Sequence, residues 1–342
     1  PFRLLLFADP PSHHHHHHHH HHLSPHLKTP RYYSRTTPSR YAPSDPAWPN
    51  RDRFVLSNGH SCALLYTMLH LTGYERPTMA DLKDFRQLNS VTAGHPENVL
   101  LDGVEVSTGP LGQGISNAVG LAIAEKHLAA RFNKEGMAPL VDHSVFVICG
   151  DGCLQEGVSS EACSLAGHLK LGKLCVLYDD NDITIDGGTN LSFTEDVAKR
   201  FEAYGWHVQA VADGNSTDTG ALEAAIAAAR AVTDRPSLIK VKTIIGLGSA
   251  KQGTHSVHGA PLGAEDLAQV KSRYGFDPEA TFAVPDAVRE FYAGKVSQGQ
   301  AHVAEWNAVL AAYEAAHPAA TAEFKRRCCA GVLPAGWKDA LP

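Results

Sequence analysis

The sequence lacks two features that would define its class at once. No apolar run in its 342 residues approaches the roughly 20 residues that a helix needs to span a bilayer. Basic residues are not in excess either, because 30 Lys and Arg face 36 Asp and Glu, for a net charge of −6. We therefore expect neither a membrane protein nor a protein that binds nucleic acid through bulk electrostatics.

Cysteine is present, but without the spacing that builds a metal site. Cys149 and Cys153 flank an aspartate, yet no second cysteine pair lies at a suitable distance to complete a zinc site. Several cysteines lie inside apolar segments, which is typical of reduced thiols packed in an intracellular protein. We therefore predict a cytoplasmic location. The seven cysteines are residues 62, 149, 153, 163, 175, 328 and 329.

Residues 1–39 show no periodic pattern of apolar side chains. Ten consecutive histidines occupy positions 13–22, and the flanking segments are rich in Pro, Ser and basic residues. Such a segment cannot bury enough apolar surface to offset the entropy lost on ordering, so we expect disorder here. An expression tag, a natural low-complexity tract and translated non-coding sequence are the alternative origins of the histidines.

From residue 41 onward the pattern changes to alternating helices and strands. This alternation indicates an α/β fold with a doubly wound parallel sheet flanked by helices. Residues 285–327 are expected to be mostly helical, after a glycine-rich loop at 246–259. The other predicted helices cover 61–71, 79–88, the segment from the turn at 107–114 to about 132, 194–204, 219–232 and 264–274; the predicted strands cover 145–149, 174–178, 207–211 and 237–244.

The most informative segment lies where two of these strands end. Gly-Asp-Gly at 150–152 follows the first strand, and Asp-Asp-Asn at 179–181 follows the second. Two parallel strands deliver the Asp151 carboxylate and the Asn181 amide oxygen to the same sheet edge. Such hard oxygen ligands suit Mg²⁺ or Ca²⁺ shared with substrate phosphates, and the flanking glycines let a diphosphate approach the backbone. We predict a diphosphate–metal site here.

Six motifs, read in order, resemble transketolase. The similarity runs from about residue 40 to residue 341 and covers the amino-terminal, diphosphate-binding domain of that family. It implies that residues 40–318 form this domain and that residues 319–342 begin a linker toward a pyrimidine-binding domain. The motifs are RDRFVLSNGH at 51–60, GHPE at 94–97, TGPLGQG at 108–114, GDGCLQEG at 150–157, SLAGHL at 164–169 and GTHSVHG at 253–259.

The resemblance implies that the cofactor is thiamine diphosphate, clamped through Mg²⁺ or Ca²⁺. The ion would be held by Asp151, by the Asn181 side chain and by the backbone carbonyl of Ile183. The cofactor-binding residues implied in this way are His60, Gly109, Pro110, Leu111, Gly150, Asp151, Gly152, Glu156, Asn181, Ile183 and His258.

The same resemblance implies a catalytic set of His60, His95, His258 and Glu156. His95 and His258 would line the sugar channel, where histidine titrates in the right range for proton transfer. Glu156 and Glu161 would lie at a dimer interface, and Glu156 could touch the partner's cofactor-activating glutamate. Plainer interpretations stay open: His60 as a helix cap, His95 as a loop residue and Glu156 as a structural interface carboxylate.

The implied activity is transfer of a two-carbon ketol unit from a ketose phosphate to an aldose phosphate, as in the pentose phosphate pathway. Departures from the family also matter. Residues 1–39 contain neither the opening helix nor the glycine-rich turn with a further active-site histidine, and the sequence ends before a pyrimidine-binding domain. We therefore expect the chain to supply half of an active site and to be inactive alone. Its substrates would be sugar phosphates, and its partner would be a second copy in a homodimer or a complementary pyrimidine-binding subunit.

Three alternatives follow for the function. The chain is a fragment or split subunit of a transketolase-type enzyme, a catalytically inactive module that keeps the cofactor site, or a relative of dihydroxyacetone synthase or deoxyxylulose-phosphate synthase. The histidine pair within 253–259 and the motif at 57–60 favour transketolase over the last group.

Overall fold

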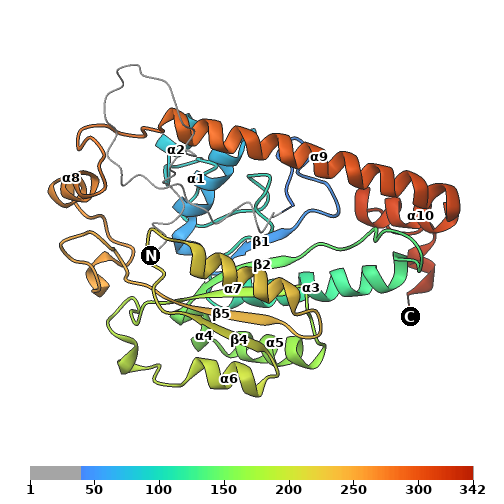
Figure 1. Cartoon of the computed structure of the whole chain (residues 1–342), viewed down its shortest axis with the longest axis horizontal. Helices are drawn as coiled ribbons and strands as arrows, with labels where there is room; N and C mark the ends of the chain where they lie inside the picture. The colour runs from blue at the N-terminus through green and yellow to red at the C-terminus, as the bar shows by residue number, and fades with distance from the viewer. Residues whose placement is uncertain (1–39, 342) are drawn as a thin grey trace, which may run out of the picture.

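The computed structural model describes residues 40–341, so the disorder expected for residues 1–39 lies outside the described part of the chain. A parallel sheet with strand order β1-β2-β3-β5-β4 forms its centre (Figure 1). Helices flank this sheet, and the predicted fold class is therefore confirmed. The strands are β1 (Arg53–Leu56), β2 (Val145–Gly150), β3 (Leu174–Asp180), β4 (His207–Val211) and β5 (Ser237–Lys242).

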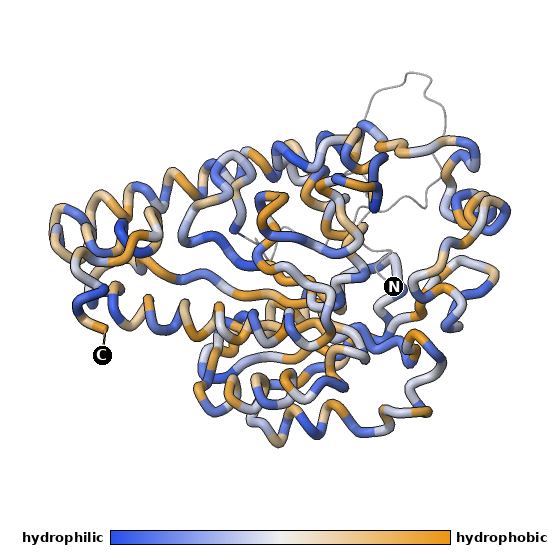
Figure 2. Tube along the Cα trace, turned by 180° about the vertical axis from the view of Figure 1, so that it is seen from behind, coloured by the Kyte–Doolittle hydropathy of each residue, from blue (hydrophilic) through white to orange (hydrophobic). Residues whose placement is uncertain are grey.

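Helices cover both faces of the sheet because successive side chains of each strand point to opposite sides. On one face, Val147 and Val176 belong to the same buried cluster as Ile115 of a long helix. The inner strands accordingly appear as hydrophobic stretches in Figure 2. The helices on this face are α3 (Gln113–Phe132), α4 (Asp151–Gln155), α5 (Gly157–His168) and α6 (Val197–Ala203).

The opposite face packs against α1 (Cys62–Thr72) and α7 (Gly220–Ala231). Ile148 and Leu177, one position along from the residues that face α3, join Leu65 and Ile226 in a second buried cluster. Successive residues of these strands therefore pack alternately into two separate cores, one on each face of the sheet.

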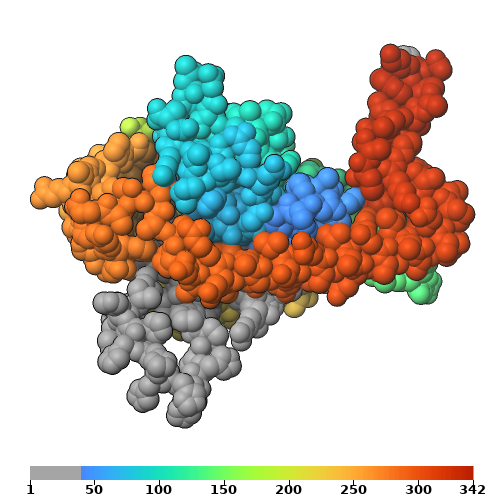
Figure 3. All heavy atoms as spheres, turned by 90° about the horizontal axis from the view of Figure 1, so that it is seen from above, coloured from blue at the N-terminus to red at the C-terminus, as the bar shows by residue number. Residues whose placement is uncertain are grey.

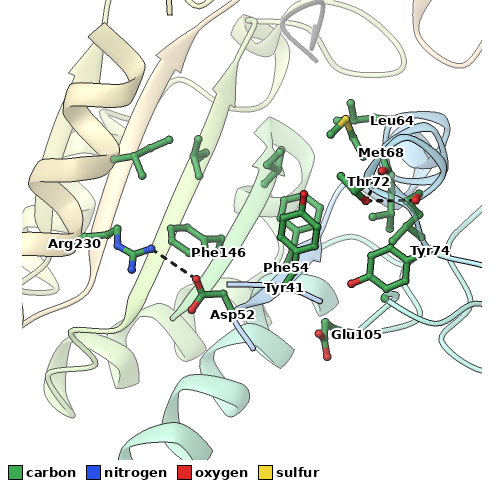
Figure 4. A pocket seen from close by; sticks show the side chains of 16 residues that line it. Tyr41, Asp52, Phe54, Leu64, Met68, Thr72, Tyr74, Glu105, Phe146 and Arg230 are labelled. Atoms are coloured by element: carbon green, nitrogen blue, oxygen red, sulfur yellow. Dashed lines mark hydrogen bonds and ion pairs between the residues drawn. The ribbon is translucent and has the colours of Figure 1, made fainter. Parts of the chain in front are cut away.

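A cavity of about 120 Å³ remains between α1, α7 and this face of the sheet. Its walls are mostly apolar and include Phe54, Phe146 and Met68 (Figure 4). On one side Arg230 reaches toward Asp52, with 3.7 Å between Nη1 and Oδ2. Because Phe54 and Phe146 are each the second residue of their strand, the cavity lies toward the amino ends of β1 and β2.

The carboxyl-terminal part is helical, as predicted for 285–327. Helix α9 (Asp286–Ala316) runs along the molecule, and α10 (Pro318–Phe324) follows at its end (Figure 1). Phe324, Trp306 and Phe132 meet there in a further buried cluster. The end of the described chain projects away from the body (Figure 3).

Short elements complete residues 40–341, and among these residues no helix is both long and apolar enough to cross a membrane. The remaining α-helices are α2 (Met79–Lys83) and α8 (Ala264–Arg273). The short turns are η3 (Gly59–Ser61), η4 (Thr189–Leu191), η5 (His255–Val257), the π-type η6 (Lys325–Cys329) and η7 (Trp337–Ala340).

Some element boundaries differ from the prediction. The helix predicted over 79–88 ends at Lys83, because Arg86 turns to a left-handed φ of 63° and donates its N–H to the carbonyl oxygen of Thr92 at 2.9 Å. The helix predicted from residue 194 begins only at Val197, because the Asp196 side chain caps it by accepting the N–H of Lys199 at 3.2 Å.

Candidate active site

Four segments that carry predicted site residues follow the carboxyl ends of neighbouring strands. Residues 57–60 follow β1, Asp151 follows β2, Asn181 follows β3, and the loop at 243–259 follows β5. Since these strands are parallel and adjacent in the sheet, the four segments emerge at one edge. Ligands of open α/β sheets bind at this edge.

Asp151 has the burial and hydrogen bonding of a candidate cation ligand. It is 3% exposed, and its Oδ1 accepts a hydrogen bond from the hydroxyl of Tyr178. Its Oδ2 is buried and has no hydrogen-bond partner among the described residues. Burial raises the pKa of Asp151 to about 7, against the hydrogen bond from Tyr178, and the nearby carboxylate of Asp180 adds to the rise. A buried carboxylate oxygen is costly without a partner, so this atom fits the role of a cation ligand.

Asn181 lies in the loop that leaves β3. Its Oδ1 accepts the backbone N–H of Ile183 at 3.0 Å, and its Nδ2 donates to Oδ2 of Asp179 at 3.2 Å. Ile183 also pairs with Gly188 in an isolated antiparallel bridge, which closes the loop. Two of the predicted metal-binding residues are therefore joined by one hydrogen bond.

The donor set fits a hard divalent cation. One carboxylate, one side-chain amide and one main-chain carbonyl are the oxygen ligands that Mg²⁺ and Ca²⁺ accept. Within residues 40–341, no three His, Cys, Asp or Glu side chains converge as a metal site. The predicted set does not depend on such a cluster, because two of its three ligands are amide and main-chain oxygens.

His60 and His258 stack on each other, with ring centroids 4.9 Å apart and planes 30° from parallel. Burial, together with the nearby imidazoles of His258 and His95, lowers the pKa of His60 to about 4. Burial also lowers the pKa of His258, whose Nδ1 is buried without a hydrogen-bond partner in the described chain. Both rings are thus neutral at pH 7 and able to accept a proton.

Close backbone contacts bring His95 toward the same place. A Cβ added at Gly109 would lie 3.2 Å from Cγ of His95, so the ring rests against the bare glycine. A Cβ added at Gly59 would lie 2.7 Å from Oγ1 of Thr108 and 2.9 Å from the Gly109 nitrogen. Glycine at these positions therefore lets the segments carrying His60 and His95 approach each other.

The segment before α3 also packs on the turn after β2. A Cβ at Gly152 would lie 2.9 Å from Cδ1 of Leu111, and one at Gly112 would lie 2.7 Å from Cβ of Glu156. Gly112 also has a left-handed φ of 78°, which favours glycine. Leu111 is half-buried, whereas Pro110 between these contacts is exposed.

Glu156 and Glu161 do not join the buried site. Both are exposed, in the region where α4 and α5 meet solvent. Nothing lies within 4 Å of a Cβ added at Gly120 of α3 or Gly157 of α5, and Leu165 of α5 is 45% exposed. Helices α3 and α5, which pack on each other, therefore present small and apolar residues to the outside.

Three further residues lie at the site although none was predicted as a site residue; Asn58 belongs to the motif at 51–60, and Asp179 to the polar run at 179–181. Tyr178 and Asp179 hold Asp151 and Asn181 through the hydrogen bonds given above. The Oδ1 of Asn58 is buried without a hydrogen-bond partner in the described chain, and its Nδ2 lies 4.0 Å from a Cβ added at Gly150. The signal available in the sequence was the run of polar residues directly after an apolar strand.

The chain is similar in sequence to known proteins of one family. The profile for "Transketolase, thiamine diphosphate binding domain" matches residues 33–334. Transketolase 1 of Saccharomyces cerevisiae is 56% identical over 304 residues, which are 89% of this chain and 44% of that protein. The transketolase of Nostoc is 55% identical over the same share of this chain and 45% of its own length.

Solved structures agree with the sequence comparison. The Pichia stipitis transketolase in complex with sedoheptulose 7-phosphate has a TM-score of 0.85 at 54% identity, covering 89% of this chain and 44% of that one. Transketolase from Leishmania mexicana gives 0.86 at 53% identity over 90% of this chain and 45% of its own. This chain therefore spans less than half the length of the relatives it matches.

Proposed function

Because this chain belongs to the transketolase family, we propose that it supplies the metal- and diphosphate-binding half of a ketol-transferring active site. One observation carries the proposal: Oδ2 of Asp151, at the carboxyl edge of the sheet, is buried and has no hydrogen-bond partner within residues 40–341. With Asn181 and the Ile183 carbonyl it would hold Mg²⁺ or Ca²⁺ against the diphosphate of thiamine diphosphate. Gly150 and Gly152 would keep side chains away from that diphosphate.

The side chains around this position fit two-carbon transfer. Thiamine diphosphate, when bound, supplies the nucleophilic carbon and the electron sink for breaking a carbon–carbon bond. The imidazoles of His60, His95 and His258 would orient sugar hydroxyls and exchange protons with them. Gly109, Pro110 and Leu111 would support the cofactor's aminopyrimidine ring. The substrates would be sugar phosphates, as in the Pichia stipitis complex.

The proposal also requires a second protein surface. Glu156, together with the exposed faces of α3 and α5, would meet a pyrimidine-binding domain carried by a complementary subunit. That domain would provide the glutamate that activates the cofactor. The 342-residue polypeptide alone should then show negligible ketol transfer.

The test is the coupled transketolase assay with xylulose 5-phosphate and ribose 5-phosphate. It is run with the purified chain alone and with a separately expressed pyrimidine-binding half. We expect turnover only in the mixture, and a fall of about 10²–10⁴-fold when the mixture contains His258→Ala or His95→Ala. Robust turnover by the chain alone would contradict the proposal that it supplies only half of the active site.

The same mixture separates the alternative functions. A chain that binds cofactor and metal but never gives turnover with a docked complementing half is a catalytically inactive module. Turnover with formaldehyde as acceptor in place of ribose 5-phosphate would indicate a dihydroxyacetone synthase-like enzyme. A reading frame directly downstream that encodes a pyrimidine-binding domain would favour a split enzyme. A cytoplasmic location stays a prediction, since some relatives are named chloroplastic.

A further inference from the structure

Near the end of strand β3, two consecutive side chains point to opposite faces of the sheet. Tyr178 lies in the buried cluster on the α3 face, so the next residue, Asp179, points to the other face. Both residues are about 2% exposed. Tyr178 contacts Asp151, which follows the neighbouring strand β2, and Asp179 contacts Asn181, two residues further along its own chain segment. Each is thus bonded to one of the two proposed side-chain ligands.

On the α3 face, the Tyr178 hydroxyl donates to Oδ1 of Asp151, the residue that follows the adjacent strand β2. The same hydroxyl is 3.4 Å from Oδ1 of Asp180, which is itself paired with Lys240 and Lys242 at 3.3 and 3.6 Å. One carboxylate oxygen of Asp151 is therefore occupied and fixed, and the buried Oδ2 is the oxygen left for a cation.

On the opposite face, Asp179 receives two hydrogen bonds. The hydroxyl of Thr243, just beyond β5, donates to Oδ1, and the Asn181 amide donates to Oδ2 at 3.2 Å. Because a carboxylate only accepts, the group facing it must be the NH₂ of Asn181. The Ile183 N–H on the other side requires the amide oxygen there. Both contacts impose the same amide orientation.

We propose that Tyr178 and Asp179 are positioning residues that fix the oxygens of Asp151 and Asn181 for a divalent cation before it binds. The inference rests on the proposed function, since it presupposes the cation site. Hydrogen-bond partners of metal ligands commonly contribute about 10–100-fold in metal affinity. A rigidly held set should matter more for Mg²⁺, which demands near-octahedral geometry, than for Ca²⁺, which accepts variable geometry.

The experiment titrates Mg²⁺ and, separately, Ca²⁺ into the full chain at a fixed excess of thiamine diphosphate, followed by calorimetry. Tyr178→Phe removes only the hydroxyl, and Asp179→Leu removes the acceptor. We expect each variant to weaken Mg²⁺ binding by about 10–100-fold and Ca²⁺ binding by clearly less. Asp179→Asn, which keeps an acceptor oxygen, should recover most of the Mg²⁺ affinity.

Two further variants serve as a control and as a substitute for Asp179→Leu. Tyr313→Phe removes another buried hydroxyl, one without a hydrogen-bond partner in the described chain and placed on α9, and should leave both affinities unchanged. Thr243→Val removes the hydrogen bond to Asp179 and leaves the Asp179 side chain itself in place. It carries the test for this face, with a smaller loss of Mg²⁺ affinity, if Asp179→Leu does not fold.

Three outcomes would overturn the inference. Unchanged Mg²⁺ affinity in Tyr178→Phe and in the Asp179 or Thr243 variant would show that the ligands need no such support. Equal losses for Mg²⁺ and Ca²⁺ would indicate general damage to the site rather than positioning. If the wild-type chain binds neither ion in the presence of the cofactor, the proposed function itself is contradicted, and the inference fails with it.

Discussion

At the scale of single residues, a charge buried away from the site offers a clean test of the electrostatics. Glu125 on α3 is 4% exposed and borders a cavity that also contains the buried His143. Burial raises the pKa of Glu125 to about 7, although the nearby ammonium of Lys173 opposes the rise. The protonated carboxyl therefore fits the fold better than the carboxylate does.

Glu125→Gln should consequently stabilise the protein at neutral and alkaline pH. The pKa is raised on folding, so the contribution of the protonated group is complete below the unfolded value of 4.5 and is lost as pH rises through about 7. We expect the variant's advantage in free energy of unfolding to grow with pH and level off above pH 7 at about 1–3 kcal/mol. Urea denaturation of both proteins from pH 5 to 8.5 measures it; an advantage that shrinks with rising pH would contradict the assignment.

Residue by residue, the sequence placed the candidate ligands at the sheet edge better than it placed the residues that contact them. Asp151 and Asn181 could be placed because two strands ending in polar residues must share an edge. The hydroxyl of Tyr178 could not, since an aromatic residue within an apolar strand is equally consistent with plain core packing. Its role depends on the register between β2 and β3, which pairs Gly150 with Asp179.

At the scale of elements, α9 carries two glycines in opposite environments. A Cβ added at Gly299 would lie 2.3 Å from the carbonyl oxygen of Tyr41 and 3.2 Å from Cα of Ala42. At Gly294 nothing lies within 4 Å. The helix therefore approaches the backbone at residues 41–42 only because position 299 has no side chain.

Alanine at these two positions should have opposite effects. Gly299→Ala should lower the free energy of unfolding by about 1–3 kcal/mol through overpacking. Gly294→Ala should raise it by about 0.5–1 kcal/mol, because alanine restricts the unfolded chain and favours helix. Chemical denaturation of the two variants beside wild type measures both. A neutral Gly299→Ala variant would mean that α9 does not pack against residues 41–42.

Periodicity predicted the long elements and missed those fixed by tertiary contacts. Strand β1 has four residues, of which only Val55 and Leu56 are buried. Its sequence therefore lacks the alternation of apolar and polar residues that predicts a strand. It exists because its backbone pairs with β2. The end of α2 is likewise set by a loop contact, the hydrogen bond from Arg86 to Thr92, rather than by any helix-breaking residue.

At the scale of the whole molecule, the outer surface of α3 and α5 should drive association. Leu165 and Val158 are 45% and 37% exposed, beside the open positions Gly120 and Gly157. Apolar surface of this kind promotes self-association. Sedimentation velocity at micromolar concentration should show a homodimer or larger species.

A matched pair of variants locates the contact. Leu165→Arg should shift the distribution toward monomer, because it places a charge in the contact. Leu267→Arg on α8, where the leucine is 44% exposed, should not. A wild-type chain that sediments as a clean monomer, or equal effects of both variants, would contradict this account of the surface.

The proposed function depends most on Asp151, which would hold a divalent cation and, through that cation, the diphosphate of the cofactor. The most direct measurement is calorimetric titration of thiamine diphosphate into wild type and Asp151→Ala, each with and without Mg²⁺. Circular dichroism on the same samples verifies that the sheet is intact. We predict Mg²⁺-dependent binding by wild type and none by the folded variant. Equal affinity of the two proteins for thiamine diphosphate would contradict the assignment.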